Sequence, residues 1–116
     1  MKKAVVFGGS GFLGSHVCDK LLEAGYNVTV FDKKESEFIK GKYNIVIGNI
    51  LSEDKVFKVI EDANIVFNFA GIADINFAES NPIATVNYNI LGNTIILEPC
   101  RKASIERYIF ASSIYV

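Results

Sequence analysis

Short hydrophobic runs alternate with longer amphipathic stretches along this chain. Five runs rich in Val, Ile and Phe span residues 3–7, 27–31, 44–47, 65–69 and 107–111. Nearly continuous apolar runs of this length are typical of strands covered on both faces, as in a parallel sheet. The pattern therefore predicts five buried strands.

The stretches between these runs have helical periodicity. In residues 12–24, Leu13, Val17, Leu21 and Ala24 fall on one predicted face, and Gly25 follows as a terminator. Ser52 precedes two acidic residues and predicts a helix to about residue 62. A long helix is predicted from residue 82 to about 103, although Pro99 removes a backbone donor and should bend it. Residues 33–42 are charged and predict a surface excursion.

This order of elements predicts an α/β fold. Strands and helices alternate along most of the chain, which favours a doubly wound parallel sheet in three α/β/α layers with right-handed crossovers. At 116 residues the chain is one domain at most.

Composition and charge narrow the classes of partner. Half of the residues are hydrophobic, 22% are charged and the net charge is −1, so we expect neither nucleic acid nor an anionic membrane surface as a partner. No apolar run reaches the roughly 18 to 20 residues of a membrane helix, and no signal peptide is evident, which predicts a cytoplasmic protein. The two cysteines, Cys18 and Cys100, form no metal or disulfide motif and are expected to fill the core.

The stretch FGGSGFLGSH at residues 7–16 fits two glycine fingerprints. Gly9-x-Gly11-x-x-Gly14 is the general dinucleotide pattern, and Gly8-x-x-Gly11-x-x-Gly14 is a wider spacing used by other nucleotide-binding enzymes. The stretch follows a predicted strand and opens a predicted helix. Glycines there let the backbone approach a pyrophosphate, and the helix N-terminus offers free N–H groups to it. The context predicts a Rossmann-type fold.

Asp32 supplies the second part of a dinucleotide site. It ends the second predicted strand, 18 residues after Gly14, near the spacing at which an acid accepts hydrogen bonds from a ribose diol. A carboxylate there repels a 2′-phosphate, so it favours NAD over NADP. Lys33 and Lys34 could offset that charge, but we favour a solvated basic pair over a phosphate clamp.

Several separated motifs resemble the NAD-dependent epimerase/dehydratase family, the extended short-chain dehydrogenases/reductases. Residues 7–14 resemble T-G-G-x-G-F-[IL]-G with Phe7 in place of threonine, and residues 48–50 resemble G-D-[IVL] with Asn49 in place of the acid. Residues 68–71, 89–92, 97–101 and 110–113 are similar to [HN]-x-A-[GA], N-[VI]-x-G, L-E-A-[CA]-R and F-x-S-S, respectively. The resemblance covers essentially the whole chain and favours the wider glycine spacing.

The resemblance implies roles for individual residues. Ser113 would hydrogen-bond the reacting oxygen of the substrate, and Asn89 would help to order the active site and its water. The implied cofactor-binding residues are Gly8, Gly11, Phe12, Leu13, Gly14, Asp32, Asn49, Ile50, Phe69, Ala70, Gly71 and Ser112. No role is fixed for Asp74 or Glu79, and His16 is expected to pack or cap.

The family's catalytic Tyr-x-x-x-Lys pair is not found in this sequence. None of the first four tyrosines has a lysine four residues later, and Tyr115 lies too near the last residue to be tested. We therefore expect the chain to be the N-terminal portion of such an enzyme, truncated after the fifth strand. It would bind NAD weakly without turnover and would self-associate, as a homodimer.

The leading interpretation is the NAD-binding part of a nucleotide-sugar epimerase or dehydratase, whose full-length form binds a nucleotide-sugar. Two alternatives stay open. One is an NADP-dependent carbonyl reductase of the same family. The other is a non-catalytic nucleotide-sensing or assembly protein with this fold, to which the unusual Phe7 and Asn49 lend some weight.

Overall fold

A five-stranded parallel sheet lies at the centre of the protein. The computed structural model describes residues 1–35 and 43–112. The strands are β1 (Lys3–Phe7), β2 (Asn27–Asp32), β3 (Asn44–Ile47), β4 (Ile65–Asn68) and β5 (Arg107–Phe110), and their order is β3-β2-β1-β4-β5. Each neighbouring pair is parallel. Strands β2 and β3 extend the sheet on one side of β1, and β4 and β5 extend it on the other side. The direction in which strands are added therefore reverses between β1 and β4.

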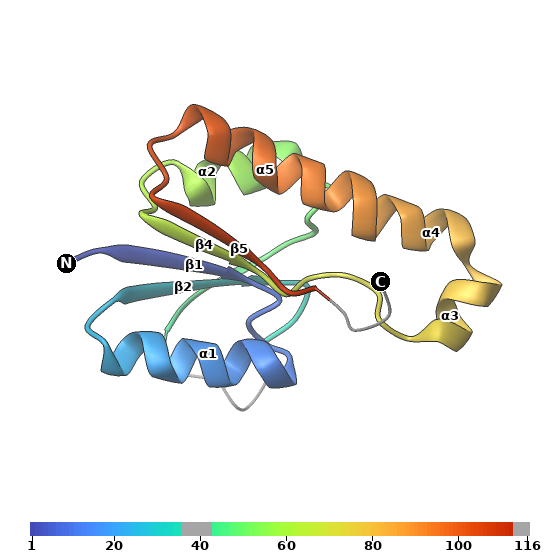
Figure 1. Cartoon of the computed structure of the whole chain (residues 1–116), viewed down its shortest axis with the longest axis horizontal. Helices are drawn as coiled ribbons and strands as arrows, with labels where there is room; N and C mark the ends of the chain where they lie inside the picture. Colours follow the sequence, from blue (N-terminus) through green and yellow to red (C-terminus); the bar gives the residue numbers. More distant parts are fainter. Residues whose placement is uncertain (36–42, 113–116) are drawn as a thin grey trace.

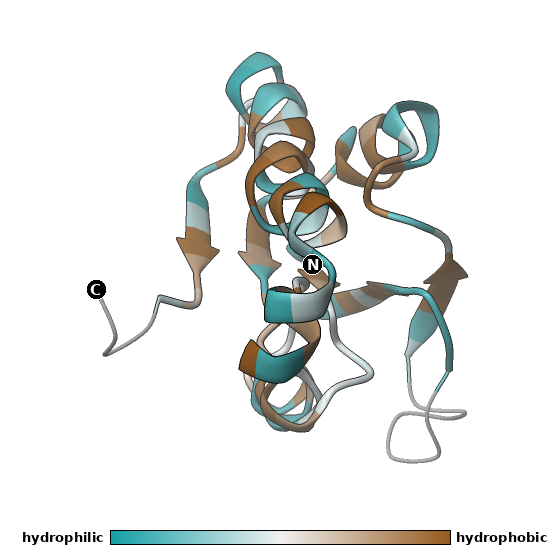
Figure 2. Ribbon diagram, turned by 90° about the vertical axis from the view of Figure 1, so that its right-hand side faces the viewer, coloured by the Kyte–Doolittle hydropathy of each residue, from teal (hydrophilic) through white to brown (hydrophobic). Residues whose placement is uncertain are grey.

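Helices cover both faces of the sheet (Figure 1). Helix α1 (Phe12–Glu23) lies on one face, and α2 (Glu53–Ile60) and α5 (Gly92–Lys102) lie on the other. Figure 2 looks along the strands, with α1 below the sheet and α5, which follows α4 (Pro82–Val86) along one rod, above it. The predicted doubly wound, three-layer α/β/α class is confirmed. Among the described residues no helix is long and apolar enough to cross a membrane.

The alternating side chains of β1 divide the interior into two cores. Ala4 and Val6 pack on the α1 face with Cys18 and Leu21, whereas Val5 and Phe7 pack on the face covered by α2 and α5. Phe7 is fully buried, and its ring centroid lies 5.0 Å from that of Phe31. The family's usual threonine is therefore replaced here by a core aromatic residue.

The two cysteines fill these cores, as expected. Burial raises the pKa of Cys18 to about 12 and that of Cys100 to about 11, because the apolar surroundings disfavour a thiolate. Both are free and buried. They are structural thiols rather than nucleophiles.

The buried face of α1 differs from the predicted one. Leu13 is 53% exposed, and Ala24 is also exposed, whereas Gly14, Ser15, Cys18 and Leu21 are buried. Small residues face the sheet because α1 starts directly from the glycine turn, where a Cβ at Gly14 would lie 2.4 Å from the Gly8 carbonyl oxygen. The prediction was wrong for Leu13 and Ala24, whereas Leu21 is buried and Val17 packs against the core, as predicted.

The predicted long helix is present but is not uniform. It consists of α4 (Pro82–Val86), a π-helical segment η1 (Asn87–Leu91) and α5, which continues past the buried Pro99 to Lys102. A short helix, α3 (Ile75–Ser80), was not predicted. Asp74 caps it, accepting hydrogen bonds from the N–H groups of Asn76 and Phe77 at 2.9 and 3.2 Å, so its role is structural.

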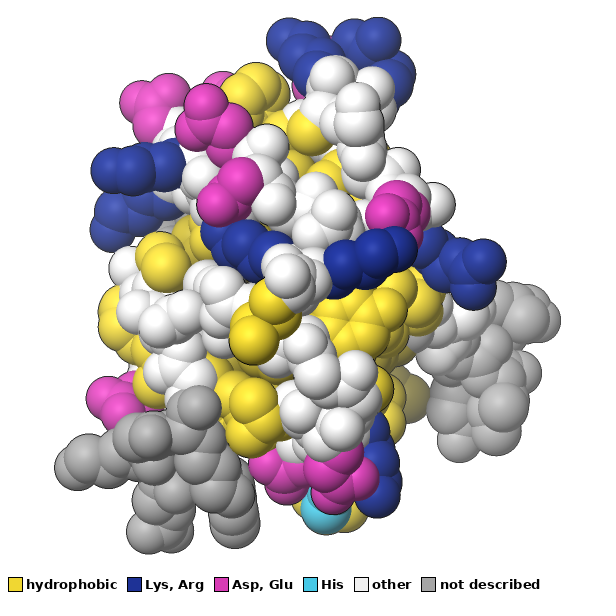
Figure 3. Space-filling model, turned by 90° about the vertical axis from the view of Figure 1, so that its left-hand side faces the viewer, with side chains coloured by type: hydrophobic (Ala, Val, Ile, Leu, Met, Phe, Trp, Pro, Cys, Tyr) yellow, Lys and Arg dark blue, Asp and Glu magenta, His cyan; other side chains and the backbone are white. Residues whose placement is uncertain are grey.

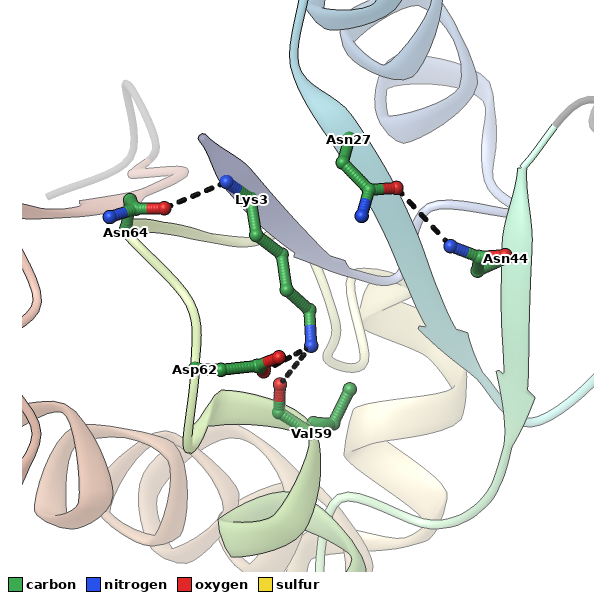
Figure 4. A network of polar contacts seen from close by, with 6 residues as sticks. All are labelled: Lys3, Asn27, Asn44, Val59, Asp62 and Asn64. Atoms are coloured by element: carbon green, nitrogen blue, oxygen red, sulfur yellow. Dashed lines mark hydrogen bonds and ion pairs between the residues drawn. The ribbon is translucent and has the colours of Figure 1, made fainter. Parts of the chain in front are cut away.

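Polar side chains tie together the amino-terminal ends of the strands, away from the site described below (Figure 4). The Lys3 ammonium contacts the Asp62 carboxylate at 2.5 Å and the Val59 carbonyl at 3.2 Å, and the Asn64 side chain accepts from the Lys3 N–H at 2.8 Å. The lysine lowers the pKa of Asp62 by hydrogen bonding to its charged form. Figure 3 shows this end of the molecule, where basic and acidic side chains surround hydrophobic ones.

Candidate functional site

A pocket of about 240 Å³ opens at the carboxyl ends of β1, β2 and β4. The strand order reverses between β1 and β4, and ligands of open α/β sheets bind at such a point. Seven of the predicted cofactor-binding residues line the pocket: Gly8, Gly11, Asp32, Ile50, Phe69, Ala70 and Gly71. The remaining lining residues are Phe31, Lys33, Gly48, Ile72 and Tyr88.

The turn after β1 is built closely against the loop after β4. Gly8 has a φ of +77°, and a Cβ there would lie 2.7 Å from the backbone nitrogen of Ala70. Its N–H donates to the Phe31 carbonyl at 2.9 Å, and the Gly11 N–H donates back to the Gly8 carbonyl at 3.1 Å. Gly14 packs on that same Gly8 carbonyl. Gly8 and Gly14 are thus required by the protein's own backbone.

Gly9 and Gly11 have different surroundings. A Cβ at Gly9 would lie 2.8 Å from the Val30 side chain, so this glycine is required by packing against β2. A Cβ at Gly11 would come no closer than 3.4 Å to the protein, and Gly11 lines the pocket. Nothing in the described chain requires a glycine at position 11, and a ligand that approaches the backbone there would.

The N-terminus of α1 lies at the same turn. Gly11 is its N-cap residue and supplies no side-chain cap. The first hydrogen bond of the helix runs from the Ser15 N–H to the Gly11 carbonyl at 2.9 Å. The N–H groups of Phe12, Leu13 and Gly14 come before it and have no acceptor within the helix. The Phe12 side chain is 82% exposed and is not among the residues that line the pocket. This geometry suits a phosphate group.

Asp32 joins the glycine turn to the end of β2. Its carboxylate accepts hydrogen bonds from the Ser10 N–H at 3.0 Å and from the Lys33 N–H at 2.6 Å. Each oxygen keeps a lone pair, which a hydroxyl donor can use. The hydroxyl oxygen of Ser10 is buried and has no hydrogen-bond partner among the described residues. The site therefore has an oriented Asp32 carboxylate, a Ser10 hydroxyl without a partner and free space beside Gly11. These three features fit a dinucleotide.

Lys33 and Tyr88 line one wall of the pocket, and Asn49 contacts Tyr88 beside it. The Asn49 amide donates to the Tyr88 hydroxyl at 3.1 Å and its oxygen accepts from the Leu51 N–H at 2.9 Å. The Lys33 ammonium lies 3.7 Å from the centroid of the Tyr88 ring. These contacts lower the pKa of Tyr88, first through the Asn49 amide and then through Lys33. No sequence pattern indicated Tyr88, because its partners come from other elements.

The loop after β4 forms the opposite wall and is held by two asparagines. Asn68 is buried. Its oxygen accepts from the Ala70 N–H at 3.0 Å, and its amide donates to Asn93 and Tyr108, both at 3.1 Å. Asn89 pairs with the backbone of Ile72 in both directions, at 2.7 and 2.9 Å.

The predicted catalytic residues are only partly described. Asn89 lies in the π-helical segment, with both ends of its amide engaged by Ile72. Ser112 is exposed, two residues beyond β5. Ser113 lies outside the described residues. His16 packs edge-on against Phe12, with ring centroids 4.8 Å apart, as a packing role predicts.

Comparison with known proteins identifies the family. Residues 4–116 match the model of the NAD dependent epimerase/dehydratase family. A putative UDP-glucose 4-epimerase of Methanocaldococcus jannaschii is 34% identical over 94% of this chain and 37% of its own length. The mouse sterol-4-alpha-carboxylate 3-dehydrogenase (decarboxylating) is 32% identical over 97% of this chain and 30% of its own length.

Solved structures of similar enzymes superpose closely on the fold. UDP-glucose 4-epimerase of Thermotoga maritima, solved with UDP-glucose, has a TM-score of 0.91 at 30% identity over 96% of this chain and 38% of that one. The Brucella ovis UDP-glucose 4-epimerase, solved with NAD, has a TM-score of 0.89 at 27% identity, over 98% of this chain and 36% of that one. The chain spans about a third of the length of these relatives. With its glycine turn, Asp32 and strand order, it belongs to the NAD dependent epimerase/dehydratase family.

Proposed function

We propose that this chain binds NAD in the pocket at the ends of β1, β2 and β4, and that it is the NAD-binding part of a nucleotide-sugar epimerase or dehydratase. The observation that carries the proposal is the glycine turn beside Asp32. The Asp32 carboxylate, which keeps free lone pairs, lines the same pocket as Gly11, and the space beside the Gly11 backbone has room for a ligand.

Each part of the site has a distinct task in this proposal. Gly11 and the first N–H groups of α1 hold the pyrophosphate, and Asp32 accepts hydrogen bonds from the adenosine ribose. Residues 48–50 hold the adenine, and the loop of Phe69, Ala70 and Gly71 lies along the rest of the cofactor. When bound, NAD supplies a hydride acceptor.

The substrate follows from the relatives rather than from the pocket. The Thermotoga maritima neighbour was solved with UDP-glucose, and UDP-glucose 4-epimerases recur among the relatives, which supports a nucleotide-sugar. The sterol dehydrogenase relative supports a second candidate, oxidation of an alcohol that is not a sugar. In either case we propose that Ser113 stabilises the developing oxyanion of the substrate and that Asn89 orders the active site.

Self-association also belongs to this proposal. Ile75, Ile83, Val86 and Ile90 are all more than half exposed along α3, α4 and η1. Exposed apolar side chains at this density on adjoining helices favour an interface between two copies of the chain. We propose a homodimer.

NAD binding tests the cofactor assignment through two substitutions. Gly11→Ala should lower NAD affinity about tenfold or more, because the added methyl group stands where the pyrophosphate approaches. Asp32→Ala should weaken binding by about 10- to 100-fold, because a hydrogen bond to a charged group contributes about 1.5–3 kcal/mol. Isothermal titration calorimetry of NAD into the purified chain measures both effects.

The matched control is Asp62→Ala, which removes an exposed carboxylate at the opposite end of the sheet. It should leave NAD affinity unchanged. Failure of the unsubstituted chain to bind NAD would overturn the proposal, as would Gly11→Ala and Asp32→Ala variants that bind as well as the parent. Circular dichroism of each variant confirms that the comparison is between folded proteins.

A further inference from the structure

The ammonium group of Lys33, an exposed residue, lies over an aromatic ring. It lies 3.7 Å from the centroid of Tyr88, a cation–π contact. The tyrosine is itself fixed, because its hydroxyl accepts from the Asn49 amide and its ring packs against the core beneath α5. In the part of the chain that the structure describes, Lys33 makes no ion pair with a carboxylate.

The position of Lys33 matters because it follows Asp32 directly. Both residues line the same pocket, and the Lys33 N–H donates to the Asp32 carboxylate at 2.6 Å. A basic side chain beside this carboxylate is what a 2′-phosphate on the adenosine ribose requires. Lysine is a flexible point charge and would reach such a phosphate if its ammonium were free.

We propose that Tyr88 is a specificity-determining residue that selects NAD over NADP by holding the Lys33 ammonium on its ring. Tyr88 acts through Lys33, and is therefore a positioning residue. A 2′-phosphate then meets the Asp32 carboxylate without a counter-ion. To recruit Lys33, NADP must first break the cation–π contact. This inference rests on the proposed binding of NAD in this pocket.

The strength of the contact sets the expected effect. An exposed cation–π contact contributes about 0.5–1 kcal/mol, which corresponds to about two- to fivefold in affinity. Tyr88→Leu should therefore lower the ratio of Kd for NADP to Kd for NAD by about two- to fivefold. Tyr88→Phe keeps the ring under Lys33 and loses only the hydroxyl bond to Asn49, so it should leave the ratio unchanged.

A double substitution separates this effect from a general change in the pocket. Calorimetric titration of both cofactors into Tyr88→Leu, Lys33→Met and the double variant gives three ratios to compare with the parent. The ratio normalises each variant by its own NAD affinity, so partial loss of folded protein does not imitate a change in selectivity. Tyr88→Leu should also make NADP binding more sensitive to salt, because a new ammonium–phosphate contact forms.

The outcomes distinguish the two proposals. If Lys33→Met abolishes the gain in NADP affinity in the Tyr88→Leu background, the inference holds. An unchanged ratio in Tyr88→Leu, or an equal gain in the double variant, overturns it while leaving NAD binding intact. A parent chain that binds neither cofactor overturns the proposed function itself.

Discussion

Gly11 and Gly14 lie three residues apart in one turn, yet they are glycines for different physical reasons. A Cβ at Gly14 would overlap the Gly8 carbonyl at 2.4 Å, and both atoms are backbone, so neither can move away cheaply. At Gly11 the backbone angles are −77° and 177°, which any residue adopts, and the nearest atom lies at 3.4 Å. One glycine is needed by the fold and the other by the proposed ligand.

Stability measurements should therefore separate the two positions. Gly14→Ala should lower the free energy of unfolding by about 1–3 kcal/mol, the usual cost of overpacking. Gly11→Ala should change it by less than about 1 kcal/mol, because the gain from a less flexible unfolded chain opposes the poorer N-cap. Urea denaturation followed by circular dichroism measures both, and equal destabilisation by the two substitutions would refute this division.

At this scale the sequence predicted the site residues that belong to recognisable motifs and missed Tyr88, which belongs to none of them. Gly8, Gly11 and Asp32 line the pocket as expected, because the turn and the strand end bring them together directly. Tyr88 could not be found in this way. It becomes part of the wall only when the helix that carries it packs beside Lys33 and Asn49.

Among the elements, β4, β5 and α5 are joined by one partly buried polar cluster. Asn68 from β4 donates to Asn93 of α5 and to Tyr108 of β5, and these two also hydrogen-bond to each other. Asn68 is only 2% exposed and also accepts from the Ala70 N–H, which fixes the loop along the pocket. The cluster couples the packing of the elements to the shape of the site.

Removing the centre of this cluster should cost much more than removing its edge. Asn68→Ala should destabilise the chain by about 2–4 kcal/mol, because it removes three hydrogen bonds and leaves the Ala70 N–H without its acceptor. Tyr108→Phe removes one hydroxyl and should cost about 1 kcal/mol. Urea denaturation gives both values. A smaller effect for Asn68→Ala than for Tyr108→Phe would mean that water satisfies the cluster.

The strands were predicted well because a strand buried on both faces leaves a continuous apolar run in the sequence. All five strands were found within one residue of their observed ends, because their apolar runs are short and continuous. The π-helical segment and α3 were missed, since a π turn has no distinct apolar period and α3 has no buried residues to reveal one. Helix α5 continues past the buried Pro99 to Lys102, so the proline does not end the helix.

For the whole molecule, the exposed helical face is the feature that the described fold leaves uncovered. Ile83 and Ile90 are 78% and 63% exposed, and with Val86 they recur at spacings of three and four residues on one helical face. Burying such side chains in a dimer would contribute roughly 1.5–3 kcal/mol each.

Ile83→Lys and Ile90→Lys should therefore weaken self-association at least about tenfold each. Sedimentation equilibrium over a range of concentrations measures this, with Leu22→Lys, 48% exposed on α1, as the matched control. Association weakened by Leu22→Lys, and not by the other two, would place the interface on the α1 face instead.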